Sequence, residues 1–513
     1  MKKIKCSRII QNSVVGIIAS ILSTLSIYIV RIVISRILGD EIYGVNSIFI
    51  SIVNAFLILE MGMSTAMIIT MYKPVADDDQ EKIRSILKFY KNFYRLFCAV
   101  LIALGIVVDI FFLKKFVKTN LNFYDVQLYF LLYLFSVVFK YLWSYKSCLL
   151  YANRQNSVIS LSTIIVTIVF TILEILGIIC FKDYRIYLLL FVLQNIAINV
   201  ICNTYANKKY PFIKQKDAAL LSSESKAQLI KIIRPMFVQR LANQLQDASS
   251  VIILGLLGIG AAIVGYFSNY VWVVHACQTI FTQIGSAFTT SFGSFYVKND
   301  NIKNTVLYYE KARFFMSWIS VVFSTLYLCL IQSFVSLFFG TAYCLTDSIA
   351  IVFSIYVFVL LNSSINLSVQ NAVGAHYLDT KWMIIQAITS IILSVVLGML
   401  WGELGVIIGM LLPITLFTGI LKGSKVYENV FFEKRSRHLV LLLRECLNFL
   451  VVSISSYLIY TLLLKPQKML HFVFSAMVIA IVSNVEMLLL NFNSKHLIDI
   501  KSKIRVKIKG VYK

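Results

Sequence analysis

The sequence predicts an all-α integral membrane protein with about 14 transmembrane helices, arranged as two six-helix lobes plus a C-terminal helix pair. Of its 513 residues, 59% are hydrophobic and only 14% are charged, whereas soluble domains average about 45–50% apolar and about 25% charged residues. The apolar residues gather in runs long enough to cross a bilayer, and the cations gather in alternate intervals between those runs. A soluble cytosolic enzyme is therefore excluded.

The helices are predicted from runs of about 20 mostly apolar residues, the length that crosses a hydrocarbon core about 30 Å thick. The first run follows a basic segment, as in a signal peptide, but it is longer and lacks a cleavage site, so we expect a retained helix. Two divisions, near 258–262 and near 401–404, depend on short glycine-containing turns. The predicted spans are 14–37, 45–71, 93–112, 126–150, 158–181, 186–205, 236–258, 262–291, 314–338, 349–373, 383–401, 404–421, 440–464 and 470–491.

The cations predict the orientation of these helices. With the N-terminus inside, the inner intervals hold 38 of the 48 Lys and Arg residues and the outer intervals hold eight. This bias follows the positive-inside rule and predicts that both termini are cytoplasmic. The net charge of +24 therefore indicates topology and attraction to anionic lipid rather than nucleic-acid binding. The remaining two cations, Arg31 and Lys140, lie within predicted helices.

Polar interruptions divide the chain. Segment 218–233 has apolar residues at helical spacing, so we expect it to lie along the inner membrane surface. The predicted domains are an N-terminal six-helix lobe (1–206), a cytoplasmic linker (207–231), a C-terminal six-helix lobe (232–421), a basic loop with an extra helix pair (422–491) and a basic cytoplasmic tail (492–513).

The two predicted lobes begin alike. Leu38-Gly39 closes the first helix and Gly44 follows in the next, while Leu257-Gly258 closes the seventh and Gly265 follows. The spacing differs by two residues, but together with the six-helix halves it favours two parallel repeats, as in several transporter folds.

Three motifs carry a resemblance to a known family: RILGDEIYGVNSIF at 36–49, LEMGMSTAMI at 59–68 and YANRQNS at 151–157. They resemble polysaccharide flippases of the Wzx type, in the multidrug/oligosaccharidyl-lipid/polysaccharide exporter superfamily. The resemblance implies two lobes around a central cavity, alternating access, and a bacterial inner (cell) membrane location. It also implies a polyprenyl-diphosphate-linked oligosaccharide, moved from the inner to the outer leaflet for capsule, O-antigen or exopolysaccharide synthesis. Membrane lipid, the polymerase and the glycosyltransferases of the same pathway are the implied partners.

Polar groups inside the predicted helices are the candidate site, because a cation deep in a bilayer costs at least about 2.5–3.5 kcal/mol and so faces a cavity or a partner. Each candidate also has a purely structural interpretation. Arg31 or Arg240 can extend toward the membrane surface, and Lys140 can pair with an acid. His275 can form a hydrogen bond between helices. The predicted substrate-binding residues are Arg31, Lys140, Arg240, Gln244, His275, Asn362 and Asn366.

Three acids are predicted to pair with cations or to bind a coupling ion: Asp247, Glu60 and Glu174. Asp247 stands seven residues after Arg240, so the two share a helix face. Glu60 belongs to the LEMGM motif, and Glu174 is a possible partner of Lys140. For Glu60 we favour an internal salt bridge over a role in coupling.

These residues suggest a mechanism. Guanidinium and ammonium groups match phosphate charge, so Arg31, Lys140 and Arg240 are predicted to hold the diphosphate while amides contact the glycan. A lipid II flippase and a drug/cation antiporter of the same superfamily are the alternatives, although an antiporter is expected to place acids at its centre. No GxxxxGK[ST], HExxH or CxxC motif occurs, so we expect a transporter without catalytic residues, metal or cofactor.

Overall fold

The computed structural model describes residues 22–60, 63–153, 155–214, 250–298, 301–373, 375, 378, 380–464 and 468–494. In these residues all regular structure is helical, with no strand. Nine helices of the described chain are long and apolar enough to cross a membrane by length and composition, as a multi-pass membrane protein requires. The chain divides into two compact units, residues 1–265 and 266–513.

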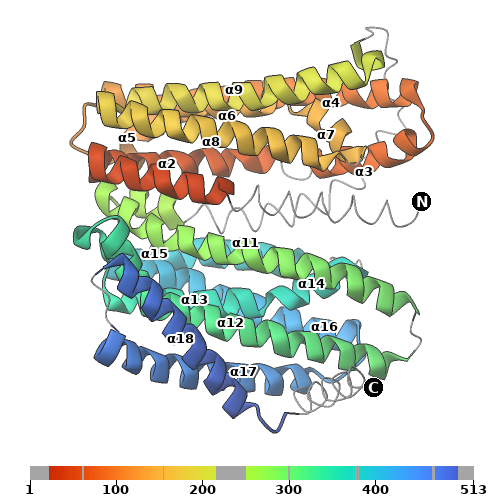
Figure 1. Cartoon of the computed structure of the whole chain (residues 1–513), viewed down its shortest axis with the longest axis vertical. Helices are drawn as coiled ribbons and strands as arrows, with labels where there is room; N and C mark the ends of the chain where they lie inside the picture. Colours follow the sequence, from red (N-terminus) through yellow and green to blue (C-terminus); the bar gives the residue numbers. More distant parts are fainter. Residues whose placement is uncertain are drawn as a thin grey trace. The chain divides into compact units, whose positions relative to one another are not determined.

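The first unit is built around α9, which lies against both α6 and α8 (Figure 1). Its described residues include helical segments over residues 22–38 and 250–256. Its elements are α2 (Asp40–Phe56), η1 (Leu57–Glu60), α3 (Met63–Ala76), α4 (Gln80–Val107), η2 (Val108–Phe112), α5 (Leu113–Phe116), α6 (Phe123–Leu142), α7 (Tyr145–Ala152), α8 (Asn156–Phe181), α9 (Tyr184–Lys209) and η3 (Pro211–Lys214).

The second unit is built around α12, which packs against α13, α17 and α18 (Figure 1). The extra helix pair expected from the sequence, α17 and α18, therefore packs on this unit. Its elements are most of α11 (Ala261–Lys298), then α12 (Ile302–Phe338), η4 (Thr341–Tyr343), α13 (Asp347–Asn362), α14 (Ser364–Val373), α15 (Thr380–Pro413), η6 (Ile414–Lys422), α16 (Gly423–Asn429), α17 (Arg435–Ile459), η7 (Tyr460–Leu464) and α18 (Met469–Leu490).

Side chains of Asp and Asn start four of the long helices. Asp79, Asn122, Asp183 and Asn301 stand just before α4, α6, α9 and α12, and each accepts a hydrogen bond from a backbone N–H of the first turn. Those N–H groups have no partner within the helix, so a side-chain cap stabilises each start.

Several predicted spans are interrupted helices. The predicted span 126–150 is divided into α6 and α7 at Trp143 and Ser144, and 349–373 is divided into α13 and α14 at Ser363. A serine hydroxyl adds a hydrogen bond at each break: Ser144 donates to the carbonyl of Tyr141 and Ser363 to that of Val359. Each of these carbonyls also accepts from the backbone N–H of the same serine, so the serines satisfy their own hydroxyls within the helix.

The glycine turn expected near 401–404 is present within α15. Gly402 has φ 59° and ψ −134°, a conformation that glycine adopts without the steric cost of a Cβ atom. The two helical arms then pack closely, since a Cβ on Gly405 would lie 1.9 Å from the carbonyl oxygen of Leu397. A Cβ on Gly409 would lie 2.4 Å from the backbone nitrogen of Ser394. Glycines therefore permit the tight hairpin.

The two repeated LG motifs also share a conformation. Gly39 has φ 90° and Gly258 has φ 77°, and each ends one helix shortly before the next begins. Within the first unit, a Cβ on Gly265 would lie 3.0 Å from the Cα atom of Gly44. The correspondence predicted between the motifs therefore extends to their backbone geometry and to direct contact.

The predicted domain boundaries remain predictions, because most of the expected linker and the predicted helix 236–258 up to residue 249 lie outside the described residues. The described start of the linker is still helical, as α9 extends to Lys209. The division between the compact units falls at Gly265 and Tyr266.

Candidate functional site

Arg31 lies in the helix over residues 22–38, and its side chain is only 2% exposed. Its guanidinium donates from both Nε and a terminal nitrogen to the Tyr43 hydroxyl, with an Nε–O distance of 3.1 Å. A terminal nitrogen also donates to Ser47 Oγ at 3.3 Å. The guanidinium carbon stands 4.8 Å from the centre of the Tyr43 ring, close enough for cation–π attraction. Residues of α2 therefore hold the cation inside the unit rather than at its surface.

A tyrosine cluster of α6 and α9 lies beside Arg31. Tyr133, Tyr184 and Tyr187 each lie within electrostatic range of the guanidinium. Tyr184 and Tyr187 stack with ring centres 5.5 Å apart, and the Tyr184 hydroxyl donates to Asn46 Oδ1 at 2.8 Å. The hydroxyls and ring faces of these tyrosines therefore lie near the buried positive charge of Arg31.

Lys140 and Tyr133 share one face of α6, because they are seven residues apart, which is two helical turns or about 10 Å along the axis. Tyr133 of α6 lies within electrostatic range of Arg31. The buried Arg31 guanidinium and the exposed Lys140 side chain therefore lie toward the same side of α6.

Lys140 stands in the last turn of α6, because the predicted helix 126–150 breaks at Trp143. The Asn199 amide donates to the carbonyls of Phe139 and Lys140 at 3.0 and 2.9 Å, which secures the turn. The Lys140 side chain itself is exposed. In the described part of the chain no carboxylate forms an ion pair with it.

Glu60 lies near Lys140 and interacts with it electrostatically. It is buried at the end of η1 and accepts a hydrogen bond of 2.9 Å from the Tyr94 hydroxyl. The Tyr94 ring stacks on Tyr141, the neighbour of Lys140, with centres 6.4 Å apart. The acid predicted to pair internally is therefore positioned by a tyrosine and contributes a negative field near the cation.

Glu174, the other acid predicted near Lys140, is elsewhere. It is buried on α8 and interacts electrostatically with Tyr187. Among the described residues, no ion pair joins Glu174 to Lys140. Its predicted role in charge pairing or coupling remains a prediction.

Three predicted site residues, Arg240, Gln244 and Asp247, lie in segment 215–249, outside the described residues. His275 lies on α11, half-buried, with its Nδ1 3.0 Å from Gln278 Oε1. Its ring meets Trp272 edge to face, with centres 6.3 Å apart. His275 is thus held by residues of its own helix.

Asn362 and Asn366 are buried and already occupied by contacts within the second unit. The side-chain oxygen of Asn366, Oδ1, accepts a hydrogen bond of 2.6 Å from the Tyr309 hydroxyl. The Asn362 amide donates to Glu445 Oε2 at 2.9 Å. Both predicted glycan contacts therefore serve, in this structure, to join α13 and α14 to their neighbours.

Asn362 belongs to a buried charge network that sequence analysis missed. Arg313 of α12 donates to both carboxylate oxygens of Glu445 on α17, at 2.7 and 2.8 Å. A further Arg313 nitrogen lies 2.8 Å from His438 Nδ1, and His438 Nε2 lies 3.0 Å from the carbonyl oxygen of Gly419. The guanidinium can only donate and the carbonyl can only accept. His438 is therefore neutral, with its proton on Nε2.

The predicted span 314–338 leaves Arg313 just outside a helix, whereas α12 begins at Ile302 and contains it. Among the described residues the buried cations are Arg31, Arg313 and Lys422. The available signals were Glu445, a carboxylate inside the predicted span 440–464, and an arginine directly before the predicted span 314–338.

Comparisons with known proteins agree with this architecture. The family described as "Polysaccharide biosynthesis protein" matches residues 9–290. A solved structure of the lipid II flippase MurJ in an inward closed conformation is similar over 94% of this chain and 99% of its own, with a TM-score of 0.70 and 15% identity. No curated protein sequence matches the chain.

Two MATE transporters have the same fold. An inward-facing member of the MOP superfamily matches over 78% of this chain and 92% of its own, with a TM-score of 0.60 and 12% identity. The eukaryotic transporter AtDTX14 matches over 85% of this chain and 99% of its own, with a TM-score of 0.54 and 12% identity. The fold is thus that of the MurJ and MATE transporters, and the predicted fold class is confirmed, although the count of 14 helices is not.

Proposed function

The chain belongs to the polysaccharide biosynthesis protein family, and from this premise we propose that it is a flippase for a polyprenyl-diphosphate-linked oligosaccharide. It moves this substrate from the inner to the outer leaflet by alternating access, for assembly of a capsule, O-antigen or exopolysaccharide. The observation that carries the proposal is the arrangement of Arg31 and Lys140 on one side of α6.

The two cations suit a diphosphate in different ways. Arg31 is fixed by Tyr43 and Ser47, so its charge is a constant feature of the first unit. Lys140 is exposed, and its ammonium is a compact charge on a flexible stem that can follow a moving phosphate. A low-dielectric surrounding strengthens both attractions relative to water. The nearby Glu60 moderates the field at Lys140, which favours release after the crossing.

The glycan requires groups that replace lost water. The oligosaccharide hydroxyls lose hydrogen bonds when they leave water, and unsatisfied polar groups are costly in an apolar medium. The half-buried His275 on α11, with Arg240 and Gln244, is proposed to contribute such contacts. Asn362 and Asn366 can contact the glycan only when they exchange their hydrogen bonds to Glu445 and Tyr309 for hydrogen bonds to the sugar.

The proposed location is the bacterial cell membrane, with both termini in the cytoplasm. Reporter fusions at the two ends, one active only outside and one only inside the membrane, test this orientation. Activity of the external reporter at either end contradicts it.

A deletion strain tests the proposed substrate. We expect surface polysaccharide to disappear while lipid-linked repeat units accumulate inside. Complementation with Lys140→Gln is expected to fail although the variant reaches the membrane, because an exposed side chain is not needed for folding. Lys182→Gln, at the left-handed end of α8, is the control and is expected to restore the polysaccharide.

Other phenotypes overturn the proposal. Lethality that a known lipid II flippase rescues indicates a lipid II flippase. Drug sensitivity with intact surface polysaccharide indicates an antiporter.

A further inference from the structure

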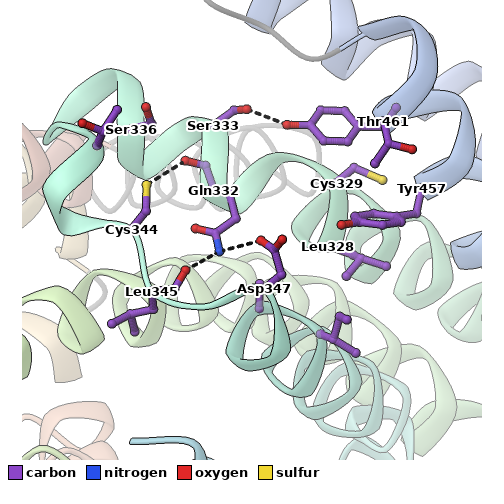
Figure 2. A pocket seen from close by; sticks show the side chains of 14 residues that line it. Leu328, Cys329, Gln332, Ser333, Ser336, Cys344, Leu345, Asp347, Tyr457 and Thr461 are labelled. Carbon is purple, nitrogen blue, oxygen red and sulfur yellow. Dashed lines mark hydrogen bonds between the residues drawn. The ribbon is translucent and has the colours of Figure 1, made fainter.

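The second unit contains a polar pocket at the ends of α12 and α17 (Figure 2). Its volume is about 450 Å³. One face of α12 forms its floor, the start of α13 forms one wall, and the end of α17 with η7 forms the other. The groups that line it and bear on its chemistry are Gln332, Ser333, Asp347, Tyr457, Tyr460 and Thr461.

Among the described residues that line the pocket, Asp347 is the only charged one. It is exposed, and it lies within electrostatic range of both Tyr457 and Tyr460 on the opposite wall. The described lining holds no lysine or arginine. The carboxylate therefore favours a cationic ligand over an anionic one.

A hydrogen-bond chain fixes the orientation of the Asp347 carboxylate. Gln332 Nε2 donates to Asp347 Oδ1 at 3.1 Å and to the carbonyl oxygen of Leu345 at 2.7 Å. The Tyr270 hydroxyl donates to Gln332 Oε1 at 2.6 Å, so the amide has one orientation. Asp347 Oδ1 is thereby occupied, and the other carboxylate oxygen is left to accept from a ligand.

The facing wall offers aromatic rings. Figure 2 shows the Tyr457 hydroxyl directed toward the side of the pocket that Gln332 and Asp347 occupy. Tyr460 is held by a hydrogen bond of 2.5 Å between its hydroxyl and that of Ser333. A carboxylate opposite tyrosine rings is a suitable setting for an organic ammonium group, which combines a charge-assisted hydrogen bond with cation–π attraction.

We propose that this pocket binds a ligand with a primary ammonium group, such as the headgroup of phosphatidylethanolamine. A lipid source is favoured because Leu458, Leu462 and Leu463, beside the pocket on α17 and η7, are more than half exposed and can contact acyl chains. A soluble amine has the same recognition chemistry. The proposed site does not depend on the function proposed above.

Native mass spectrometry of the full chain in detergent tests this site. The probes are phosphatidylethanolamine, phosphatidylglycerol with the same acyl chains, and soluble glycerophosphoethanolamine. Asp347→Asn keeps an acceptor for Gln332 and removes the charge. Asp79→Asn, at the exposed cap of α4, is the matched control, because asparagine caps a helix as well as aspartate does.

We expect phosphatidylethanolamine to bind, and Asp347→Asn to weaken it at least about tenfold, the effect of losing one charge-assisted hydrogen bond. Asp79→Asn is expected to leave the affinity unchanged. Binding of the soluble probe with the same sensitivity to Asp347→Asn supports the site and identifies a soluble amine as a sufficient ligand. Equal binding of phosphatidylglycerol, equal affinity of Asp347→Asn, or binding of no probe overturns the proposal.

Discussion

Arg313 of α12 and Glu445 of α17 form a two-point ion pair inside the second unit, with side chains only 4% and 10% exposed. The pair joins the C-terminal helix pair to the body of the unit, and Asn362 and His438 complete its hydrogen bonds. A buried pair contributes little beyond an apolar substitute, but removal of one partner leaves a costly charge. The pair therefore fixes the position of α17.

Glu445→Gln is expected to lower the free energy of unfolding by about 3–5 kcal/mol, because Arg313 keeps its charge in a buried site. Denaturant unfolding of the purified protein in detergent measures this. The chain offers a matched control in Glu428 and Arg435, which also form a two-point pair but at the surface. Glu428→Gln is expected to cost below about 1 kcal/mol. Equal losses for the two variants would show that the buried pair is not required.

Tyr43→Phe keeps the ring beside Arg31 and removes the hydroxyl that accepts from its guanidinium. We expect a loss of about 1–3 kcal/mol, the cost of leaving a buried donor without its acceptor. Tyr205→Phe is the control, because Lys209 contacts that ring and hydroxyl at an exposed position. Thermal melting compares the two, and an unchanged melting temperature for Tyr43→Phe would contradict the role given to Tyr43.

Gly409→Ala tests the close hairpin within α15. Its Cβ would meet the backbone of Ser394 at 2.4 Å, so the helical arms must separate, at a cost of about 1–3 kcal/mol. Gly260→Ala has no atom within 4 Å of the added carbon and is expected to be nearly neutral. Equal yield and melting temperature for both variants would mean that the arms are not closely packed.

Glu41 gives a pH-dependent contact outside the predicted spans. Its carboxylate accepts from the Thr119 hydroxyl at 2.7 Å and from the side chain and backbone of Asn120. These bonds lower the pKa of Glu41 below its ordinary value of 4.5 despite partial burial. The stabilisation is present above the ordinary pKa and is lost as pH falls through the lowered one.

Glu41→Gln is therefore expected to be slightly less stable than the unchanged chain near pH 7, by below about 1 kcal/mol. The difference should shrink as pH falls below 4.5. Melting temperatures across this range measure it, and a difference that grows with acidity would contradict the assignment.

Much of the architecture follows from the sequence. Apolar runs predict the long helices, and Gly402 and Gly258 mark turns that the structure contains. Cation counting singled out Arg31, which is buried, and Lys140, which stands at a helix end. It missed Arg313, because its partner Glu445 is 132 residues away along the chain. Local sequence patterns show the spacing of apolar residues and the charge of the loops. A buried ion pair depends instead on which helices become neighbours in the fold.

The most direct test of the proposed function is translocation in proteoliposomes. A polyprenyl-diphosphate-linked oligosaccharide with a fluorescent sugar is placed in both leaflets, and a membrane-impermeant reductant quenches the accessible label. We expect the unchanged chain to raise the quenched fraction from about half to nearly all of the label, and Lys140→Gln to hold it near half. Failure of the unchanged chain to move the substrate, or equal translocation by Lys140→Gln, would contradict the account.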